Sequence, residues 1–336
     1  MLRGPSLLGF AALIAAAPLL ARSDVPQQLP TLPPASPIDP AIDPATSMGS
    51  VEFAHVDSRM TVPVSVSGKG PFPFFVDTGA ERTVISRQLA EQLGLPAGPR
   101  VNLTALGGTS SVATVVIPEL EVTPLAASRN IAAPALEAQH LGGSGLLGVD
   151  ALDGRAVTID FDRGEMRVRK AEVARAPRPK PDEIIVTARN KFGQLIVTNA
   201  AYRERRIRVI VDTGAAVSVG NLALYRQVAR TRVAIGPMSF TSVTGEHLEI
   251  PAATVDEVRI GTMTMSGLPI AFADLAPFEK LGLKEEPTLL LGMNALRYFR
   301  RVDIDFSNRR IQFLLPRYRA RPSSLPITYD AQPSRI

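Results

Sequence analysis

Apolar and polar residues alternate over short stretches along most of the chain, and turn residues separate these stretches. Because successive side chains of a strand point to opposite faces, each stretch is typical of a half-buried β-strand. The first strands are expected at 51–56, 60–66 and 72–76. Helical spacing is confined to short segments, at 87–93, 149–152, 222–229 and 294–299. The pattern therefore predicts an all-β fold with few, short helices.

Two of these short helices have cap residues. Ser86 precedes the segment 87–93 and Gly94 follows it, and Asn221 precedes the segment 222–229. A serine or asparagine oxygen accepts a hydrogen bond from the first helical turn, and glycine tolerates the left-handed conformation that ends a helix. These residues predict the ends of both helices.

One pattern occurs twice. An apolar strand is followed by an acid, a hydroxyl residue, a glycine and an alanine. An ionised carboxylate at the end of a buried strand costs several kcal/mol to bury unless another group stabilises its charge. The two copies are Asp77-Thr78-Gly79-Ala80 and Asp212-Thr213-Gly214-Ala215.

Further landmarks follow both copies in the same order. A glycine-tipped hairpin is expected around residue 107 in the first half and around residue 245 in the second. A Leu-Leu-Gly segment then ends at Gly148 and at Gly292, each before a short helix. Two lobes of similar sequence pack naturally about a pseudo-twofold axis, and a loop near that axis meets its own duplicate. The repeat therefore predicts two homologous lobes and brings the two acids together.

Composition excludes several other functions. The chain has no cysteine, so disulfides, thiol catalysis and cysteine–metal sites are absent. Its three histidines lie far apart, at positions 55, 140 and 247, and form no metal-ligand pair at helical spacing. The formal charge of +5 is too mild and dispersed to indicate a nucleic-acid partner. No metal or cofactor is expected.

The ends of the chain differ from the two lobes. Residues 1–23 combine an early arginine, an apolar stretch and small residues near the end, which is typical of an export signal. An uncleaved anchor is the alternative. The protein is expected to be exported, periplasmic or secreted, without stable membrane insertion after signal removal. The expected segments are the signal 1–23, a Pro-rich lead-in 24–49, lobes 50–170 and 183–316, a Pro-rich linker 171–182 and a loose tail 317–336.

With these motifs, the sequence resembles the aspartic proteases over nearly all of residues 50–316. The alanine after each Asp-Thr-Gly looks like the retroviral-type branch, whereas two lobes in one chain look like pepsin. The resemblance implies two acid-protease β-barrel lobes related by a pseudo-twofold axis. It implies a monomer in which both lobes build one site; pairing of lobes between chains is the alternative.

By the same resemblance, Asp77 and Asp212 are the catalytic pair. Thr78 and Thr213 interlock the two loops, Gly79 and Gly214 let backbone N–H groups approach the carboxylates, and Ala80 and Ala215 complete the motif. The hairpins would be flaps over the substrate, with tips at Gly107, Gly108, Thr109, Thr244 and Gly245. The first tip lacks the tyrosine of pepsin flaps, so both flaps are expected to close, as in retroviral dimers.

The implied reaction is hydrolysis of a peptide or protein substrate by water activated between the two acids. A hydroxyl in place of Ala80 or Ala215 could donate to a carboxylate and favour its ionisation, and alanine cannot. The sequence therefore predicts a pH optimum less acidic than that of pepsin-like enzymes. The alternative function is a peptide-binding or regulatory protein on the same scaffold with little turnover. The lead-in 24–49 is either a removable pro-segment or a tether.

Overall fold

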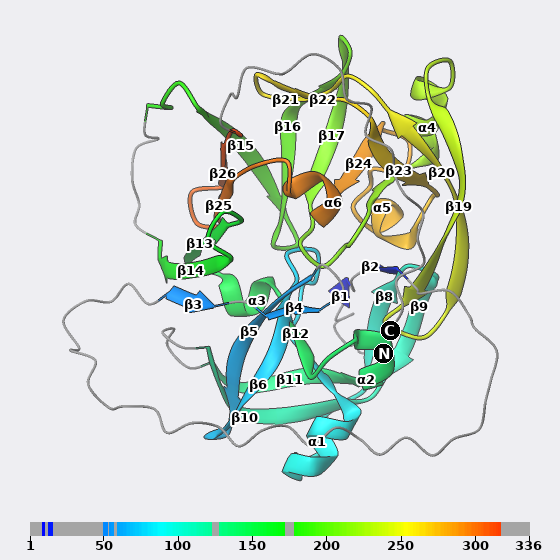
Figure 1. The fold of residues 1–336 in the computed structure, drawn as a ribbon. Coiled ribbons are helices and arrows are strands. Elements are labelled where there is room, and N and C mark those ends of the chain that lie inside the picture. Colours follow the sequence, from blue (N-terminus) through cyan, green and yellow to red (C-terminus); the bar gives the residue numbers. More distant parts are fainter. Residues whose placement is uncertain are drawn as a thin grey trace, which may run out of the picture.

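The computed structural model describes residues 9–10, 13–15, 50–52, 54–56, 59–122, 128–171 and 178–316. The expected lead-in 24–49 and tail 317–336 lie outside these residues, as do most of the expected signal and the centre of the linker. The predictions for those segments stay predictions. The described chain forms two lobes, the first below the second in Figure 1.

The first lobe is a barrel of six strands, which pair in the order β10-β11-β7-β12-β6-β5 and close through β10 and β5. Alternate residues of β5 and β6, such as Val62, Val64, Phe74 and Val76, fill its core. The strands are β5 (Arg59–Val66), β6 (Lys69–Val76), β7 (Val84–Ser86), β10 (Thr114–Val122), β11 (Ser128–Leu136) and β12 (Gly145–Leu147). Added to them are β4 (Ala54–Val56), the hairpin β8 (Val101–Ala105) and β9 (Gly108–Val112), and the helices α1 (Arg87–Leu93), α2 (Ala138–Leu141) and α3 (Val149–Leu152).

The second lobe repeats this pairing. In both lobes the strand that carries the acid runs parallel to the Leu-Leu-Gly strand, which in turn is antiparallel to the short strand after the acid. The strands are β16 (Gln194–Tyr202), β17 (Arg205–Val211), β18 (Ser218–Gly220), β19 (Val233–Ser242), β20 (His247–Val255), β21 (Val258–Ile260), β22 (Met263–Met265), β23 (Leu268–Phe272) and β24 (Thr288–Leu291). The helices are α4 (Leu222–Val228), α5 (Ala276–Lys280) and α6 (Met293–Leu296).

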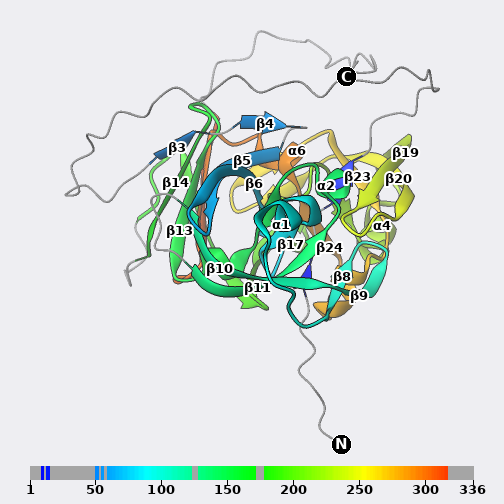
Figure 2. The same ribbon diagram turned by 90° about the horizontal axis from the view of Figure 1, so that it is seen from below.

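The closing hairpin of each lobe pairs with that of the other lobe. These hairpins are β13 (Arg155–Asp160) with β14 (Glu165–Lys170), and β25 (Arg301–Asp305) with β26 (Arg310–Leu314). β13 is antiparallel to β25, β15 (Glu183–Lys191) extends the sheet beyond β26, and β3 (Ser50–Glu52) extends it beyond β14. Figure 2 shows β13 and β14 along one side of the first lobe. The sequence predicted both hairpins but not that one sheet joins the lobes.

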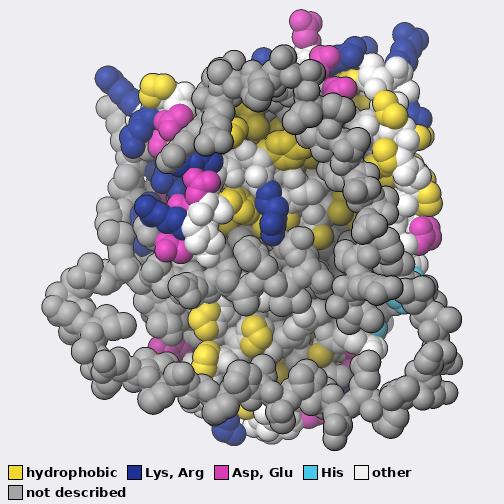
Figure 3. All heavy atoms as spheres, viewed as in Figure 1, with side chains coloured by type: hydrophobic (Ala, Val, Ile, Leu, Met, Phe, Trp, Pro, Cys, Tyr) yellow, Lys and Arg dark blue, Asp and Glu magenta, His cyan; other side chains and the backbone are white. Residues whose placement is uncertain are grey.

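Basic and acidic side chains are intermixed on the part of Figure 3 that overlies this shared sheet. The ion pairs of this sheet include those between Arg300 and Asp162 (2.6 Å), Arg301 and Asp303 (2.8 Å), and Arg310 and Asp305 (3.5 Å). Asp160 and Asp305 accept hydrogen bonds from the backbone of the following turns. These repeated acids of the closing hairpins therefore have a structural role.

Two short strands of the N-terminal segment pair with the flap hairpins. β1 (Gly9–Phe10) is parallel to β8, and β2 (Leu13–Ala15) is antiparallel to β19. Both lie within the expected export signal. Each flap hairpin therefore has a strand edge that can pair with an additional extended chain.

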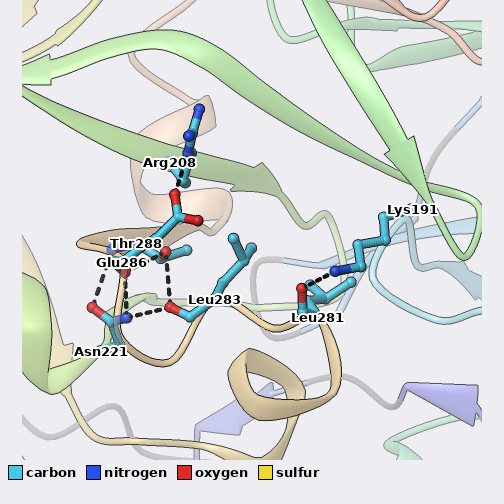
Figure 4. A network of polar contacts seen from close by, with 7 residues as sticks. All are labelled: Lys191, Arg208, Asn221, Leu281, Leu283, Glu286 and Thr288. Atoms are coloured by element: carbon cyan, nitrogen blue, oxygen red, sulfur yellow. Dashed lines mark hydrogen bonds and ion pairs between the residues drawn. The ribbon is translucent and has the colours of Figure 1, made fainter.

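The caps of the helices are as predicted. Ser86 Oγ accepts from Leu89 N, Gly94 adopts the left-handed conformation, and Asn221 Oδ1 accepts from Leu224 N at the start of α4. The Asn221 amide group also donates to the carbonyls of Leu283 (2.9 Å) and Glu286 (2.7 Å), as Figure 4 shows. This side chain therefore fixes the loop before β24 as well as α4.

Several elements differ from the sequence prediction. Residues 110–117, an alternating stretch that follows the first glycine tip, form parts of two strands, because β9 ends at Val112 and β10 begins at Thr114. The helix expected at 294–299 begins and ends earlier, as α6. The sequence did not predict α2 and α5, because neither begins with a side-chain cap and neither follows a Leu-Leu-Gly segment.

Candidate active site

Each acid stands at the point where its strand leaves the sheet. Asp77 follows β6 and its N–H donates to the Leu147 carbonyl (2.9 Å), while Asp212 follows β17 and donates to Leu291 (3.0 Å). Behind the loops, Val149 N donates to Ala80 O and Met293 N donates to Ala215 O, at 2.8 Å in both lobes. The Leu-Leu-Gly segments therefore hold the two acid loops in matching ways.

Glycine is required at the end of each Leu-Leu-Gly segment. A Cβ atom at Gly148 would lie 2.4 Å from the backbone of Arg82, and one at Gly292 would lie 2.7 Å from the backbone of Val217. Contacts this short do not occur for real side chains, so the acid loop and the segment can cross only at a glycine.

The two threonines interlock the lobes, as the resemblance implied. Thr78 Oγ1 donates to the Val211 carbonyl (2.9 Å), and Thr213 Oγ1 donates to the Val76 carbonyl (2.8 Å). Each hydroxyl also accepts from the backbone N–H of the other threonine, at 3.2 and 3.1 Å. All four hydrogen bonds are buried and cross between lobes, and each contributes about 1 kcal/mol. They fix the distance between the two acid loops.

The glycine of each motif lies against the acid of the other lobe. A Cβ atom at Gly79 would be 2.5 Å from Asp212 Oδ2, and one at Gly214 would be 2.4 Å from Asp77 Cγ. The backbone N–H groups of these glycines donate to the acids of their own lobes, at 2.9 Å to Asp77 Oδ1 and 2.8 Å to Asp212 Oδ1. Any larger residue would separate the two carboxyl groups.

The carboxyl groups of Asp77 and Asp212 are in contact and almost fully buried, with exposed fractions of 0% and 4%. Burial raises the pKa of both groups. The negative charge of Asp212 raises the pKa of Asp77 further, whereas the Gly214 N–H and a hydrogen bond with Asp77 oppose the rise for Asp212. The two buried carboxyl groups therefore titrate as one coupled pair, and this pair holds a proton to a higher pH than a free aspartate does.

One buried oxygen of Asp77 also indicates a shared proton. Asp77 Oδ1 accepts from the N–H groups of Gly79 and Ala80, both at 2.9 Å, but Asp77 Oδ2 has no hydrogen-bond donor among the described residues. A proton between Oδ2 and Asp212 would satisfy this oxygen, because two ionised carboxylates in contact have no donor to share. This oxygen therefore fits a carboxyl pair that shares one proton.

The flap tips reach across to the opposite lobe. Leu106 of the first flap (β8–β9) is buried in an apolar cluster of the second lobe, beside Ala215 and Phe240. Val243 of the second flap (β19–β20) is buried in a cluster of the first lobe, beside Phe75 and Leu136. Both flap tips are therefore packed against the opposite lobe, and closure over a substrate stays a prediction.

The tip residues themselves lie at the turns of both hairpins, as predicted. Gly107, Gly108 and Thr109 lie at the turn of the first flap, and Thr244 and Gly245 lie at that of the second. A Cβ atom at Gly245 would lie 2.6 Å from His140 of α2, and one at Gly107 would lie 3.3 Å from Glu246 of the other flap. The glycines allow this close packing.

The family model described as aspartyl protease matches the chain twice, at residues 62–151 and 198–295. The chain belongs to the aspartyl protease family. Its lobes are of the retropepsin-like type, and both are present in one chain. No curated protein matches the sequence of this family member.

Sequence reasoning missed several residues that support the acid loops of this aspartyl protease homologue. Asp150 accepts hydrogen bonds from Thr83, and Asn294 accepts them from Ser218 at the equivalent place in the second lobe. Their equivalent positions after Leu-Leu-Gly were a signal in the sequence that could have identified them.

Among the described residues, no group of three histidine, aspartate or glutamate side chains is placed to hold a metal ion. None of their helices has the length and apolar character needed to cross a membrane.

Proposed function

We propose that this aspartyl protease homologue is an exported endopeptidase. It hydrolyses peptide bonds with a water molecule activated between Asp77 and Asp212. The contact between these two buried carboxyl groups, one from each lobe, is the observation that supports the proposal.

The burial and charge of the pair suit this chemistry. In this mechanism Asp212 begins ionised and takes a proton from the water, while Asp77 begins protonated and donates its proton to the carbonyl oxygen of the substrate. The attack gives a neutral gem-diol. The proton roles then reverse: Asp212 gives a proton to the leaving amine, and Asp77 takes one back from the gem-diol. The pair ends with one proton, as it began.

An extended peptide is the substrate that the flaps favour. β8 and β19 both pair through their backbones with short strands of the N-terminal segment. Main-chain pairing of this kind selects an extended chain rather than a particular side chain. Removal of the expected signal, residues 1–23, would free both edges for a substrate.

The test compares the cleavage of an unfolded protein by the wild type, Asp77→Asn and Asp212→Asn. Asparagine keeps the shape and the Oδ1 acceptor but cannot exchange the proton, so each variant is expected to lose about 10²- to 10⁴-fold in kcat. Asp160→Asn is the matched control, because this acid also recurs in both lobes but serves only a turn, and it is expected to keep full activity.

Cleavage that survives Asp77→Asn or Asp212→Asn in a folded variant would disprove the paired-acid mechanism. A wild type that binds peptides tightly without cleaving them would instead support a peptide-binding protein on the same scaffold.

A further inference from the structure

One side chain of the second lobe reaches the acid loop of the first. Gln194, at the start of β16, is buried, and its Nε2 donates to the carbonyl oxygen of Gly79. This is where the β15–β16 hairpin approaches the first lobe near the centre of the molecule in Figure 1. The Oε1 atom of Gln194 is buried without a donor among the described residues. The hydrogen bond from Nε2 to Gly79 therefore orients the amide group.

The contact continues to the carboxyl pair through one peptide unit. The Gly79 carbonyl and the Ala80 N–H belong to the same peptide group, and this N–H donates to Asp77 Oδ1 at 2.9 Å. A hydrogen bond to a peptide oxygen polarises the group and strengthens its N–H as a donor. Gln194, the Gly79–Ala80 peptide and Asp77 therefore form one hydrogen-bond chain.

The first lobe does not repeat this residue. Ile196 pairs with Ile210 in the second lobe, and Thr61 pairs with Phe75 in the first, in both cases two residues before the acid. By this register the position equivalent to Gln194 is Arg59. The residue type at this position therefore differs between the two lobes.

The same loop has a second tie to the second lobe. Glu81, which follows Ala80, forms an ion pair with Lys280 of α5, and both side chains are mostly buried. The segment from Gly79 to Glu81 is therefore held from the second lobe at two points, of which only the Gln194 contact lies on the hydrogen-bond chain to Asp77.

We propose that Gln194 is a positioning residue for the carboxyl pair, which orients the Asp77 loop and strengthens the Ala80 N–H that stabilises the ionised form of Asp77. The proposal rests on the proposed function for its kinetic consequences. A donor to the carboxylate lowers its pKa, so Gln194 opposes the rise that burial and Asp212 cause. Without it the pair holds its proton to a higher pH.

Two variants test the role of Gln194. Gln194→Met keeps the approximate volume but removes the donor, so kcat should fall by about tenfold or more with little change in KM, and the alkaline limb of the pH–rate profile should move to higher pH. Gln194→Glu keeps the shape, and its carboxyl group can donate to Gly79 only when protonated. Its rate relative to the wild type should therefore recover as the pH falls.

Lys191→Met is the matched control on the same hairpin. Lys191 donates to the Leu281 carbonyl within the second lobe, as Figure 4 shows, and so its loss should leave the alkaline limb in place. If folded Gln194→Met keeps the wild-type kcat and alkaline limb, the proposal is wrong. Equal activity of Gln194→Met and Gln194→Glu at every pH would also overturn it, because Gln194 would then only fill space.

A readout without substrate separates this proposal from the proposed function. The carboxyl ¹³C resonance of Asp77, assigned by its loss in Asp77→Asn, should titrate at higher pH in Gln194→Met than in the wild type. If the wild type cleaves nothing, the proposed function fails, and this titration still decides the role of Gln194. An unchanged titration would contradict it.

Discussion

At the scale of the residue, alanine rather than a hydroxyl side chain lies close to each of the two acids. Alanine follows Gly79 and Gly214, and both alanines are fully buried. Their backbone N–H groups face the carboxyl pair, but their side chains provide no donor. The ionised form of the pair is therefore stabilised by backbone groups and Gln194 rather than by a neighbouring hydroxyl.

A hydroxyl added at this position should shift the pH dependence. Ala80→Ser or Ala215→Ser places an O–H group near a carboxylate, which lowers its pKa. We expect the pH–rate profile of either variant to move to lower pH, and the wild type to be most active at a less acidic pH than pepsin-like enzymes. Profiles of kcat/KM against pH measure this. A wild type active only in strong acid, or a serine variant shifted to higher pH, would contradict it.

The same pair should reduce stability as the pH rises. Burial raises the pKa of Asp77 in the folded chain, so the folded state binds this proton more tightly than the unfolded state does. The stabilisation is complete below the ordinary aspartate pKa and is lost as the pH rises toward the raised value. Asp77→Asn removes the effect. Urea unfolding should find this variant more stable than the wild type at pH 7, by a margin that shrinks toward pH 4; a less stable variant at pH 7 would refute this.

At the scale of the element, each flap places one apolar side chain, called its anchor here, in the core of the opposite lobe. These anchors are Leu106 and Val243, which lie at the hairpin tips and are buried in apolar clusters of the opposite lobe. The carboxyl pair has almost no exposed surface in this arrangement. We expect a peptide to reach the pair when Leu106 or Val243 leaves its cluster.

Truncation of an anchor should weaken the closure of the flap more than it lowers the stability of the fold. Leu106→Ala removes apolar surface worth about 2 kcal/mol, so kcat/KM should fall by about tenfold or more. The melting temperature should change little, because the flap can leave the other lobe without unfolding its own. Val243→Ala is the reciprocal variant and should behave alike. A large loss of melting temperature with normal kcat/KM would show that both residues serve only the core.

The sequence predicted elements well where a local signal determines them. The cap residues Ser86 and Asn221 predicted the starts of α1 and α4, and the glycines at 107 and 245 predicted both hairpin tips. It could not predict the shared sheet of the closing hairpins, since nothing in either hairpin specifies a partner in the other lobe. Gln194 was missed for the same reason: its role depends on a contact between residues far apart in the chain.

At the scale of the whole molecule, the duplicated chain makes a single site. The threonine interlock, the shared sheet and the crossed flaps all join one lobe to the other within the chain. The duplicated motif alone predicted that the two acids would meet, because like loops face each other across a pseudo-twofold axis. Because the two lobes are separate stretches of one chain, each can diverge, as Gln194 and Arg59 have done.

The most direct test of the central claim is peptide cleavage by a mixture of Asp77→Asn and Asp212→Asn, measured beside each variant and the wild type at equal concentration. If one chain builds the whole site, the wild type is active as a monomer and the mixture is no more active than the two variants separately. If lobes pair between chains, some pairs in the mixture hold both acids and activity returns. Recovery of activity in the mixture, or a wild type that cleaves nothing, would contradict the account.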